Sequence, residues 1–251
     1  MVTFAPNLRK LALIIGTAIT YCQTAAAQNQ MKTEHSPAQC GDAAPEIAAL
    51  GISSELKLNA QLPSSAWSQT TPITFCADWQ GKNLDPLRQT SIRALWTHTT
   101  LYLRFECHYR EIYVFDDSET SGRRYQLWDR DVAEAFLQPD PSQLRAYKEF
   151  EVSPNGMWVD LDIVSGKDTD LKSGLQRSVW RDEAHKIWIA ELAIPMQSLT
   201  AKFDPAAVWR VNFFRVERDG SGRFYSAWHA TNTPEPNFHV PEVFGKLLFQ
   251  K

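Results

Sequence analysis

Apolar and polar residues alternate along much of the chain from residue 67 onward. In the run LYLRFECHY, Leu101, Leu103, Phe105 and Cys107 fall on one side of an extended chain and the intervening residues on the other. A period of two predicts a β-strand with one face in the core and the other turned to polar surroundings. This pattern predicts strands at 92–97, 101–108, 131–138, 148–152, 157–164, 186–194, 208–217 and 223–229.

The segments between these strands have the composition of turns. Glycine, proline, serine, asparagine and aspartate are concentrated at 153–156, 219–222 and 233–236. Helical periodicity is restricted to short runs such as PMQSLTA at 195–201. Many short strands joined by turns predict an all-β fold, an antiparallel β-sandwich with immunoglobulin-like layering.

The N-terminal 27 residues have the pattern of a secretory signal peptide. Arg9 and Lys10 precede an apolar run at 11–21, and three alanines end at Ala27. A bilayer needs about 20 apolar residues, so this run predicts export rather than a membrane span; a buried helix is the competing interpretation. The protein is therefore expected to be periplasmic or extracellular. We expect residues 28–62 to be a flexible segment and residues 63–251 to form one domain.

Charge and cysteine content limit the classes of function. The chain has 26 Lys and Arg against 29 Asp and Glu, and removal of Arg9 and Lys10 leaves 24 basic residues and a net charge of −5. Nucleic-acid binding is not expected of this balance. Three cysteines remain after residue 27, and Cys76 and Cys107 lie in strand-like segments, so they are the predicted disulfide pair of an oxidising compartment.

Catalytic signatures are weak. The sequence has neither G-x-S-x-G nor H-E-x-x-H. A glycosidase needs two carboxylates at a cleft, and acid pairs two residues apart are frequent. Alternation alone places two acids that are two residues apart on the same face of a strand. We therefore interpret these pairs as parts of solvated sheet faces and not as catalytic pairs. The pairs are Asp129 with Asp131, Glu149 with Glu151, and Asp160 with Asp162.

Metal and haem binding are further alternatives. Calcium prefers oxygen ligands, and four aspartates that flank one loop could supply them, although a solvated acidic turn explains the same residues. They are Asp116, Asp117, Asp129 and Asp131. Met157 and Met196 are the candidate axial ligands of a haem, but Met157 lies on the apolar side of its strand and is better explained as core.

Two aromatic residues stand in polar or proline-rich surroundings. Trp128 lies in YQLWDRDVAE, and Glu134 follows it by an even number of residues, which places both on one face of an extended chain. Phe238 follows Asn237 in a segment stiffened by prolines. Flat rings beside hydrogen-bonding groups suit the C–H face and the hydroxyl rim of a pyranose. We expect both rings at one shallow site near an end of the sandwich; for Trp128, a core position at a strand end is the alternative.

Four runs, in order, resemble the family 9 carbohydrate-binding modules and their family 9-like relatives. They are WDRDVAEAFLQP, FEVSPNGMWVD, WRVNFFRVER and PNFHVPEVFGKLLF, and the similarity covers roughly 65–251. The most specific elements are W-x-x-D-x-x-E-x-F and the closing F-G-x-L-x-F. The resemblance implies a β-sandwich in which two aromatic rings clamp a terminal sugar, with calcium bound in characterised members.

The resemblance also assigns residues. Trp128 matches one ring and Glu134 the acid that binds sugar hydroxyls. Phe238 stands where the best-known modules have a second tryptophan, beside the matching Asn237.

Two positions depart from the family. Glu151 replaces a ligand-binding arginine, and Tyr109 aligns with a ligand-binding aspartate.

The sequence thus predicts an exported, non-catalytic protein that binds the end of a sugar or polysaccharide. The family resemblance implies a role in polysaccharide breakdown, in which the protein acts either alone or as a partner of secreted glycoside hydrolases. A haem-binding redox sandwich and a hydrolase accessory with weak activity are the alternatives. No cofactor is assigned to the favoured sugar-binding function, and calcium is its candidate.

Overall fold

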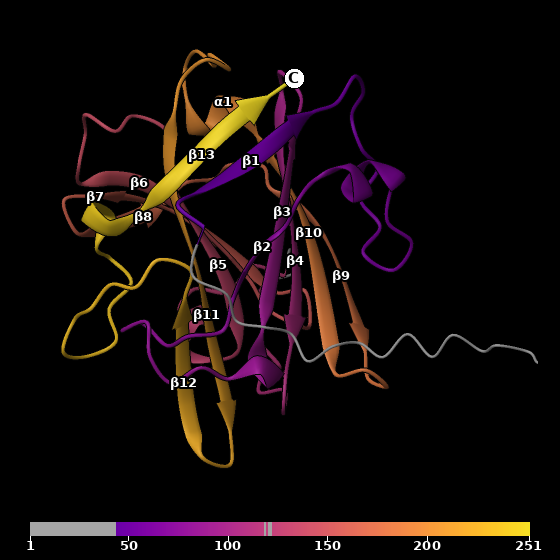
Figure 1. Cartoon of the computed structure of the whole chain (residues 1–251), viewed down its shortest axis with the longest axis vertical. Helices are drawn as coiled ribbons and strands as arrows, with labels where there is room; N and C mark the ends of the chain where they lie inside the picture. Colours follow the sequence, from indigo (N-terminus) through magenta and orange to yellow (C-terminus); the bar gives the residue numbers. More distant parts are fainter. Residues whose placement is uncertain (1–43, 118, 120–121) are drawn as a thin grey trace, which may run out of the picture. The chain divides into compact units, whose positions relative to one another are not determined.

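The computed structural model describes residues 44–117, 119 and 122–251, and its elements are almost all strands (Figure 1). The strands are β1 (Glu46–Gly51), β2 (Ile73–Phe75), β3 (Thr90–Trp96), β4 (Thr100–His108), β5 (Val132–Gln138), β6 (Ala146–Val152), β7 (Trp158–Val164), β8 (Lys167–Asp170), β9 (Gln176–Asp182), β10 (Ile187–Pro195), β11 (Trp209–Asp219), β12 (Gly222–Ala227) and β13 (Gly245–Gln250). One α-helical turn, α1 (Met196–Leu199), follows β10, and 3-10 turns lie at Ser65–Gln69, Pro86–Arg88, Leu127–Asp129 and Pro241–Val243.

All eight strands predicted from alternation are present, with ends within two residues of the predicted ones. Five further strands escape that pattern: β1, β2, β8, β9 and β13. Among the described residues no helix is long and apolar enough to span a membrane.

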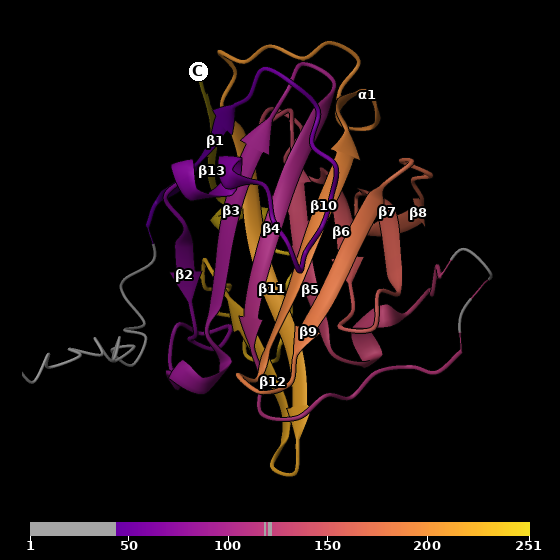
Figure 2. The same ribbon diagram turned by 90° about the vertical axis from the view of Figure 1, so that its right-hand side faces the viewer.

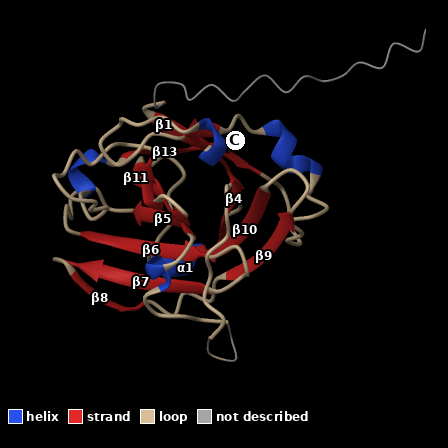
Figure 3. Cartoon of the chain, turned by 90° about the horizontal axis from the view of Figure 1, so that it is seen from below, coloured by secondary structure: helices blue, strands red, loops and turns tan. Residues whose placement is uncertain are grey.

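The strands form one curled sheet in the order β8-β7-β6-β5-β11-β13-β1-β3-β4-β10-β9, with β12 beside β11 and β2 beside β3. Seen from below, the strands surround the interior (Figure 3). The layer of β3, β4, β10 and β9 stands in front of β11, β5, β6 and β7 in Figure 2. The prediction of an all-β, sandwich-like fold is confirmed. The sheet is mixed rather than purely antiparallel, because β1 runs parallel to both β13 and β3.

The start of the described chain differs from the expected flexible segment. Within residues 28–62, β1 joins β13 to β3, and Ile47 and Ala49 are buried. Farther along, the Asn59 N–H donates to Glu191 Oε2 at 2.8 Å. The expectation of flexibility is therefore wrong for residues 44–62. The predicted signal peptide and residues 28–43 lie outside the described residues.

Two apolar clusters lie on opposite faces of β5, β6 and β11. The inter-layer core takes one set of alternating residues, for example Ala133 and Phe213. The other set, for example Phe136 and Phe214, forms an outer cluster with Phe238. Both faces of β5 are consequently buried, although its sequence alternates. The residues that cover the outer face include Phe115, Leu127, Trp128, Phe238 and Phe244, and this cover creates the site described below.

The predicted disulfide is not formed. Cys107 is a free, buried thiol, whereas Cys76 is disulfide-bonded. Strand β3 explains the separation: Phe75 pairs with Thr90, and Thr90 pairs with Cys107. Two strand spacings amount to roughly 9–10 Å, beyond the Cα separation of about 7 Å that a disulfide can bridge.

Gly245, at the start of β13, is expected to tolerate no side chain. A Cβ there would lie 2.8 Å from Trp228 Cη2 and still nearer the His229 ring. Because the Trp228 ring is buried, Gly245→Ala should lower the free energy of unfolding by about 1–3 kcal/mol, the usual cost of overpacking. Urea denaturation measures the change.

Gly220→Ala is the matched control, since a Cβ at Gly220 would meet nothing within 4 Å. Equal urea midpoints for the two variants would contradict the expected clash.

Candidate functional site

A cavity of about 460 Å³ lies on the outer face of the sheet, over β5, β6, β7 and β11. The strands supply its floor, which includes Glu134, Phe136, Glu149, Leu161 and Val216. Residues 125–128 and 236–239 supply further lining. The sequence predicted a site near an end of the sandwich. The cavity lies instead on a face of the sheet.

Trp128 reaches this cavity because of the turn that carries it. Leu127 is fully buried in the outer cluster and fixes the turn. Gln126 before it has a left-handed backbone conformation, with φ 59°, and the Arg130 N–H donates to the Leu127 carbonyl at 3.0 Å. The indole of Trp128 is half-buried and meets the Tyr125 ring edge-to-face, with centroids 5.3 Å apart.

Phe238 lines the same cavity from the C-terminal segment. Its ring stacks on Phe214 of β11 with centroids 4.2 Å apart and planes inclined by 13°, and only 8% of the residue is exposed. Tyr225 of β12 meets Phe238 edge-to-face. The ring is thus positioned by strand residues beneath it. The structure places Trp128 and Phe238 at one cavity, as the sequence predicted.

Asn237 precedes Phe238 and is exposed at the cavity. Its side-chain carbonyl accepts a hydrogen bond from the His239 N–H at 3.0 Å. This bond fixes the orientation of the amide, so the NH₂ group is left to donate to a ligand.

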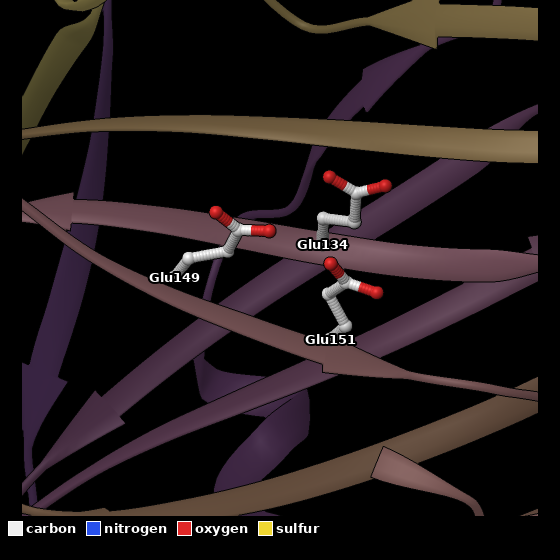
Figure 4. Close-up of side chains that lie close together, drawn as sticks. All are labelled: Glu134, Glu149 and Glu151. Carbon is white, nitrogen blue, oxygen red and sulfur yellow. The ribbon is translucent and has the colours of Figure 1, made fainter. Parts of the chain in front are cut away.

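Three glutamates meet at the floor. Glu134 on β5 is the cross-strand partner of Glu151 on β6, and Glu149 stands two residues before Glu151 on the same face. Carboxylate oxygens of the three lie within 4.8 Å of one another, and the three side chains lie close together (Figure 4). Each residue is at most 3% exposed. Glu134 and Glu149 line the cavity, and Glu151 is not among its lining residues.

Burial dominates the electrostatics of these carboxyls. Desolvation raises the pKa of all three, and the charges of neighbouring glutamates raise the pKa of Glu134 and Glu151 further. No donor in the described part of the chain reaches Glu134 Oε1, Glu149 Oε2 or either oxygen of Glu151.

The interpretation of the acid pairs as solvated faces is wrong for Glu149 with Glu151. Alternation identifies a polar side of β6, but the loops over the outer face remove that side from water. Asp160 on β7 is fully buried as well; its carboxylate accepts the Ser173 N–H at 2.7 Å.

The three glutamates should make the protein less stable as pH rises. A carboxyl whose pKa is higher in the folded than in the unfolded state stabilises the fold below its ordinary pKa, and this stability is lost as pH rises through the folded pKa. For Glu151 the ordinary value is 4.5 and the folded value lies well above it. Glu151→Gln should therefore raise the melting temperature relative to wild type by an amount that grows from acidic to neutral pH.

Thermal melts across this range measure that difference. The control is Glu111→Gln, the same change at an exposed carboxylate outside the cavity. A difference between Glu151→Gln and wild type that stays constant with pH would show that Glu151 ionises normally in the folded protein.

Tyr109 does not belong to this site. Its ring packs in the inter-layer core, on the other side of the sheet from the cavity, and its hydroxyl donates to Glu183 at 2.7 Å. Although Tyr109 aligns with a ligand-binding aspartate of the family, its side chain does not reach the cavity.

The four aspartates predicted to bind calcium do not converge. Asp131 is buried and accepts the N–H groups of Tyr113 and Arg218, so it joins backbone segments. The remaining three are spread over the surface: Asp117 pairs with Arg124, Asp129 pairs with Arg223, and Asp116 is exposed. Among the described residues the glutamates form the acidic cluster that could hold a metal ion.

The candidate haem ligands are also separated. Met196 is buried in the inter-layer core, whereas Met157 packs against the outer cluster.

Sequence reasoning missed several residues of the cavity. Tyr225, Arg223 and Asp168 come from segments without a motif, whereas His239 lies in the run PNFHVPEVFGKLLF but was not singled out. Glu149 could have been found, because it shares the strand face of Glu151 and that face includes the cross-strand position of Glu134.

Comparisons with known proteins agree with this fold. The family described as "Carbohydrate family 9 binding domain-like" matches residues 59–251. An "Extracellular protein" of Arthroderma benhamiae is 26% identical over 207 residues, which cover 75% of this chain and 89% of the relative.

Two solved structures are of a family 9 carbohydrate-binding module from Caldicellulosiruptor kristjanssonii. The complex with cellotriose has a TM-score of 0.56 and 14% identity, over 82% of this chain and 93% of that one. The complex with glucose has a TM-score of 0.57 and 14% identity, over 82% and 95%. At this identity the likeness to the solved structures shows the fold, and the family match over more than half of the sequence shows the membership: the chain belongs to the carbohydrate family 9 binding domain-like family.

Proposed function

We propose that this protein binds the end of a sugar or polysaccharide in the cavity over β5 and β6. The observation that carries the proposal is the meeting of Trp128 and Phe238 with buried carboxyls at one cavity. A volume of about 460 Å³ falls in the usual range for small-ligand sites, about 300–1,000 Å³. Support also comes from the family, and from the two similar modules, which are complexes with cellotriose and glucose.

The residues divide the work of binding by their chemistry. The ring faces of Trp128 and Phe238 offer flat apolar contact to the C–H face of a pyranose. Glu134 and Glu149 line the floor and accept hydrogen bonds from hydroxyls, while the oriented amide of Asn237 donates. A sugar bound there would take over interactions that the buried carboxyl oxygens lack.

The geometry favours binding over hydrolysis. Hydrolysis needs two carboxyls on either side of the glycosidic bond, whereas the glutamates stand on two adjacent strands and so approach a ligand from one side. The protein is therefore proposed to be non-catalytic. A role in polysaccharide breakdown beside secreted hydrolases is supported by the family resemblance alone. Export is supported by the signal-like N-terminus and by the relative named as extracellular.

A glycan array with the protein beginning at residue 28 tests the function, followed by calorimetry with the best ligand. We expect binding to chain ends, so that oligosaccharides and the matching monosaccharide compete. The same samples, incubated with polysaccharides, should release no reducing sugar. Absence of binding to every glycan would reject the proposal, and release of sugar would replace it by a hydrolase.

A further inference from the structure

The cavity has an imbalance of charge. Glu134, Glu149 and Asp168 line it, and Glu151 stands beside the first two. The basic residues that line the cavity are Arg223 and His239.

Neither basic residue neutralises the three glutamates. The Arg223 guanidinium contacts the Tyr225 hydroxyl at 3.1 Å and pairs with Asp129 at 3.6 Å. The His239 ring is exposed and hydrogen-bonds the Tyr147 hydroxyl at 2.7 Å. Its charge lowers the pKa of Glu149. Burial favours the protonated form of these three carboxyls, and their charged form is costly unless a cation accompanies it. The folded chain therefore leaves a place for a positive charge at the floor of the cavity.

We propose that the ligand brings this charge, and that the preferred sugar is a hexosamine with a free, protonated amine whose ammonium group binds between Glu134 and Glu149. This inference rests on the proposed sugar-binding function and specifies its ligand class.

The spacing of the carboxyls suits an ammonium group. An ammonium has three N–H donors, and charge-assisted bonds of about 2.7–2.9 Å in tetrahedral directions place their acceptors roughly 4.6 Å apart. The carboxylate oxygens of the three glutamates lie within 4.8 Å of one another. Glu134 Oε1 and Glu149 Oε2 have no donor in the described part of the chain, although both residues are at least 97% buried.

The surroundings favour an organic cation over a bare metal ion. Calcium takes about six to eight oxygen ligands, whereas the cluster brings together one oxygen from each of three carboxyls. The cavity of about 460 Å³ is also much larger than the roughly 30 Å³ of one water molecule or a small ion. Trp128 and Tyr125 line it as well, and the faces of such rings attract ammonium groups.

Calorimetry on matched sugars tests the inference. The probes are glucosamine and its short β-1,4 oligomers, the N-acetylated forms of the same sugars, and glucose with cello-oligosaccharides, all in metal-free buffer. Wild type should bind the free-amine form at least about tenfold more tightly than either neutral form, since hydrogen bonds between charged groups are worth more than neutral ones.

Two variants test the site within the protein. Glu149→Gln and Glu134→Gln should each reduce the preference for the amine to about threefold or less, because each removes one of the two lining carboxylates. Glu111→Gln, at an exposed carboxylate outside the cavity, should keep the full preference. If either cavity variant fails to fold, the comparison of amine and N-acetyl sugars on wild type still decides.

The outcomes separate this inference from the proposed function. Equal binding of charged and neutral sugars would overturn the inference and leave sugar binding intact. Calcium that binds alone, in a manner lost in Glu149→Gln, with no preference for the amine, would identify a metal site and also overturn it. No binding to any sugar would reject both proposals.

Discussion

Arg215→Met is expected to lower the free energy of unfolding by about 3–5 kcal/mol, the largest single effect foreseen for this protein. The Arg215 guanidinium is fully buried between the layers and contacts Glu217 Oε1 at 2.6 Å. It also donates to Thr90 Oγ1 at 3.0 Å and lies over the Trp188 ring. Without it, Glu217 remains in the core, 3% exposed, without its principal cation.

The deficit of Arg215→Met should increase with pH. Desolvation already raises the pKa of Glu217 to about 7 against the opposing charge of Arg215, so loss of the arginine raises it further. A carboxyl with a raised folded pKa costs stability as pH rises through that value. Urea denaturation at mildly acidic and mildly alkaline pH should show a larger loss at the alkaline one.

The double variant Arg215→Met, Glu217→Leu is the control. Replacing both partners by apolar residues removes the unpaired charge and should recover most of the loss. If the double variant is as unstable as Arg215→Met, the loss comes from packing around Trp188 and not from the isolated carboxylate.

The strands that the sequence predicted are those with a buried face of their own. In β4, Leu101, Leu103 and Phe105 belong to the inter-layer core and alternate with residues of different character, so the strand is visible in the sequence itself. β8 reads KDTD, is exposed throughout, and exists only because it pairs with β7. The shortest strand, β2, is defined by its pairing with β3. Pairing with a distant or neighbouring strand leaves no periodicity in a short segment, so these elements could not be predicted.

The same distinction explains the site. Trp128, Glu134, Asn237 and Phe238 lie in segments that the family resemblance covers, and the structure places all four at one cavity. Glu149 was assigned to a solvated face because alternation tells only that a side is polar. Whether that side is covered depends on residues outside β6, such as Leu127, Trp128 and Phe238, which the pattern of β6 does not report. The alignment of Tyr109 with a ligand-binding aspartate likewise did not tell on which side of the sheet its ring lies.

Trp128→Ala is expected to weaken sugar binding by about tenfold or more while changing the melting temperature little. Stacking of a nucleic-acid base on an aromatic side chain is worth about 1–3 kcal/mol; by analogy we expect the same scale for a sugar on the indole, and 1.4 kcal/mol corresponds to a factor of ten. The indole is only half-buried, and the turn below it is held by Leu127, which the variant retains. Calorimetry with the best glycan gives the affinity, and thermal melts give the stability.

Unlike Trp128→Ala, Phe238→Ala should lower the stability of the protein as well as its affinity for sugar. Phe238 is 8% exposed and stacks on Phe214 at 4.2 Å, so its loss should cost up to about 3 kcal/mol of stability as well as affinity. Trp180→Ala is the matched control: Trp180 is a half-buried tryptophan on β9 that does not line the cavity, and its loss should leave sugar binding unchanged. Unchanged affinity in both Trp128→Ala and Phe238→Ala would show that the two rings serve only the outer cluster, and the sugar would then have to bind elsewhere on the protein.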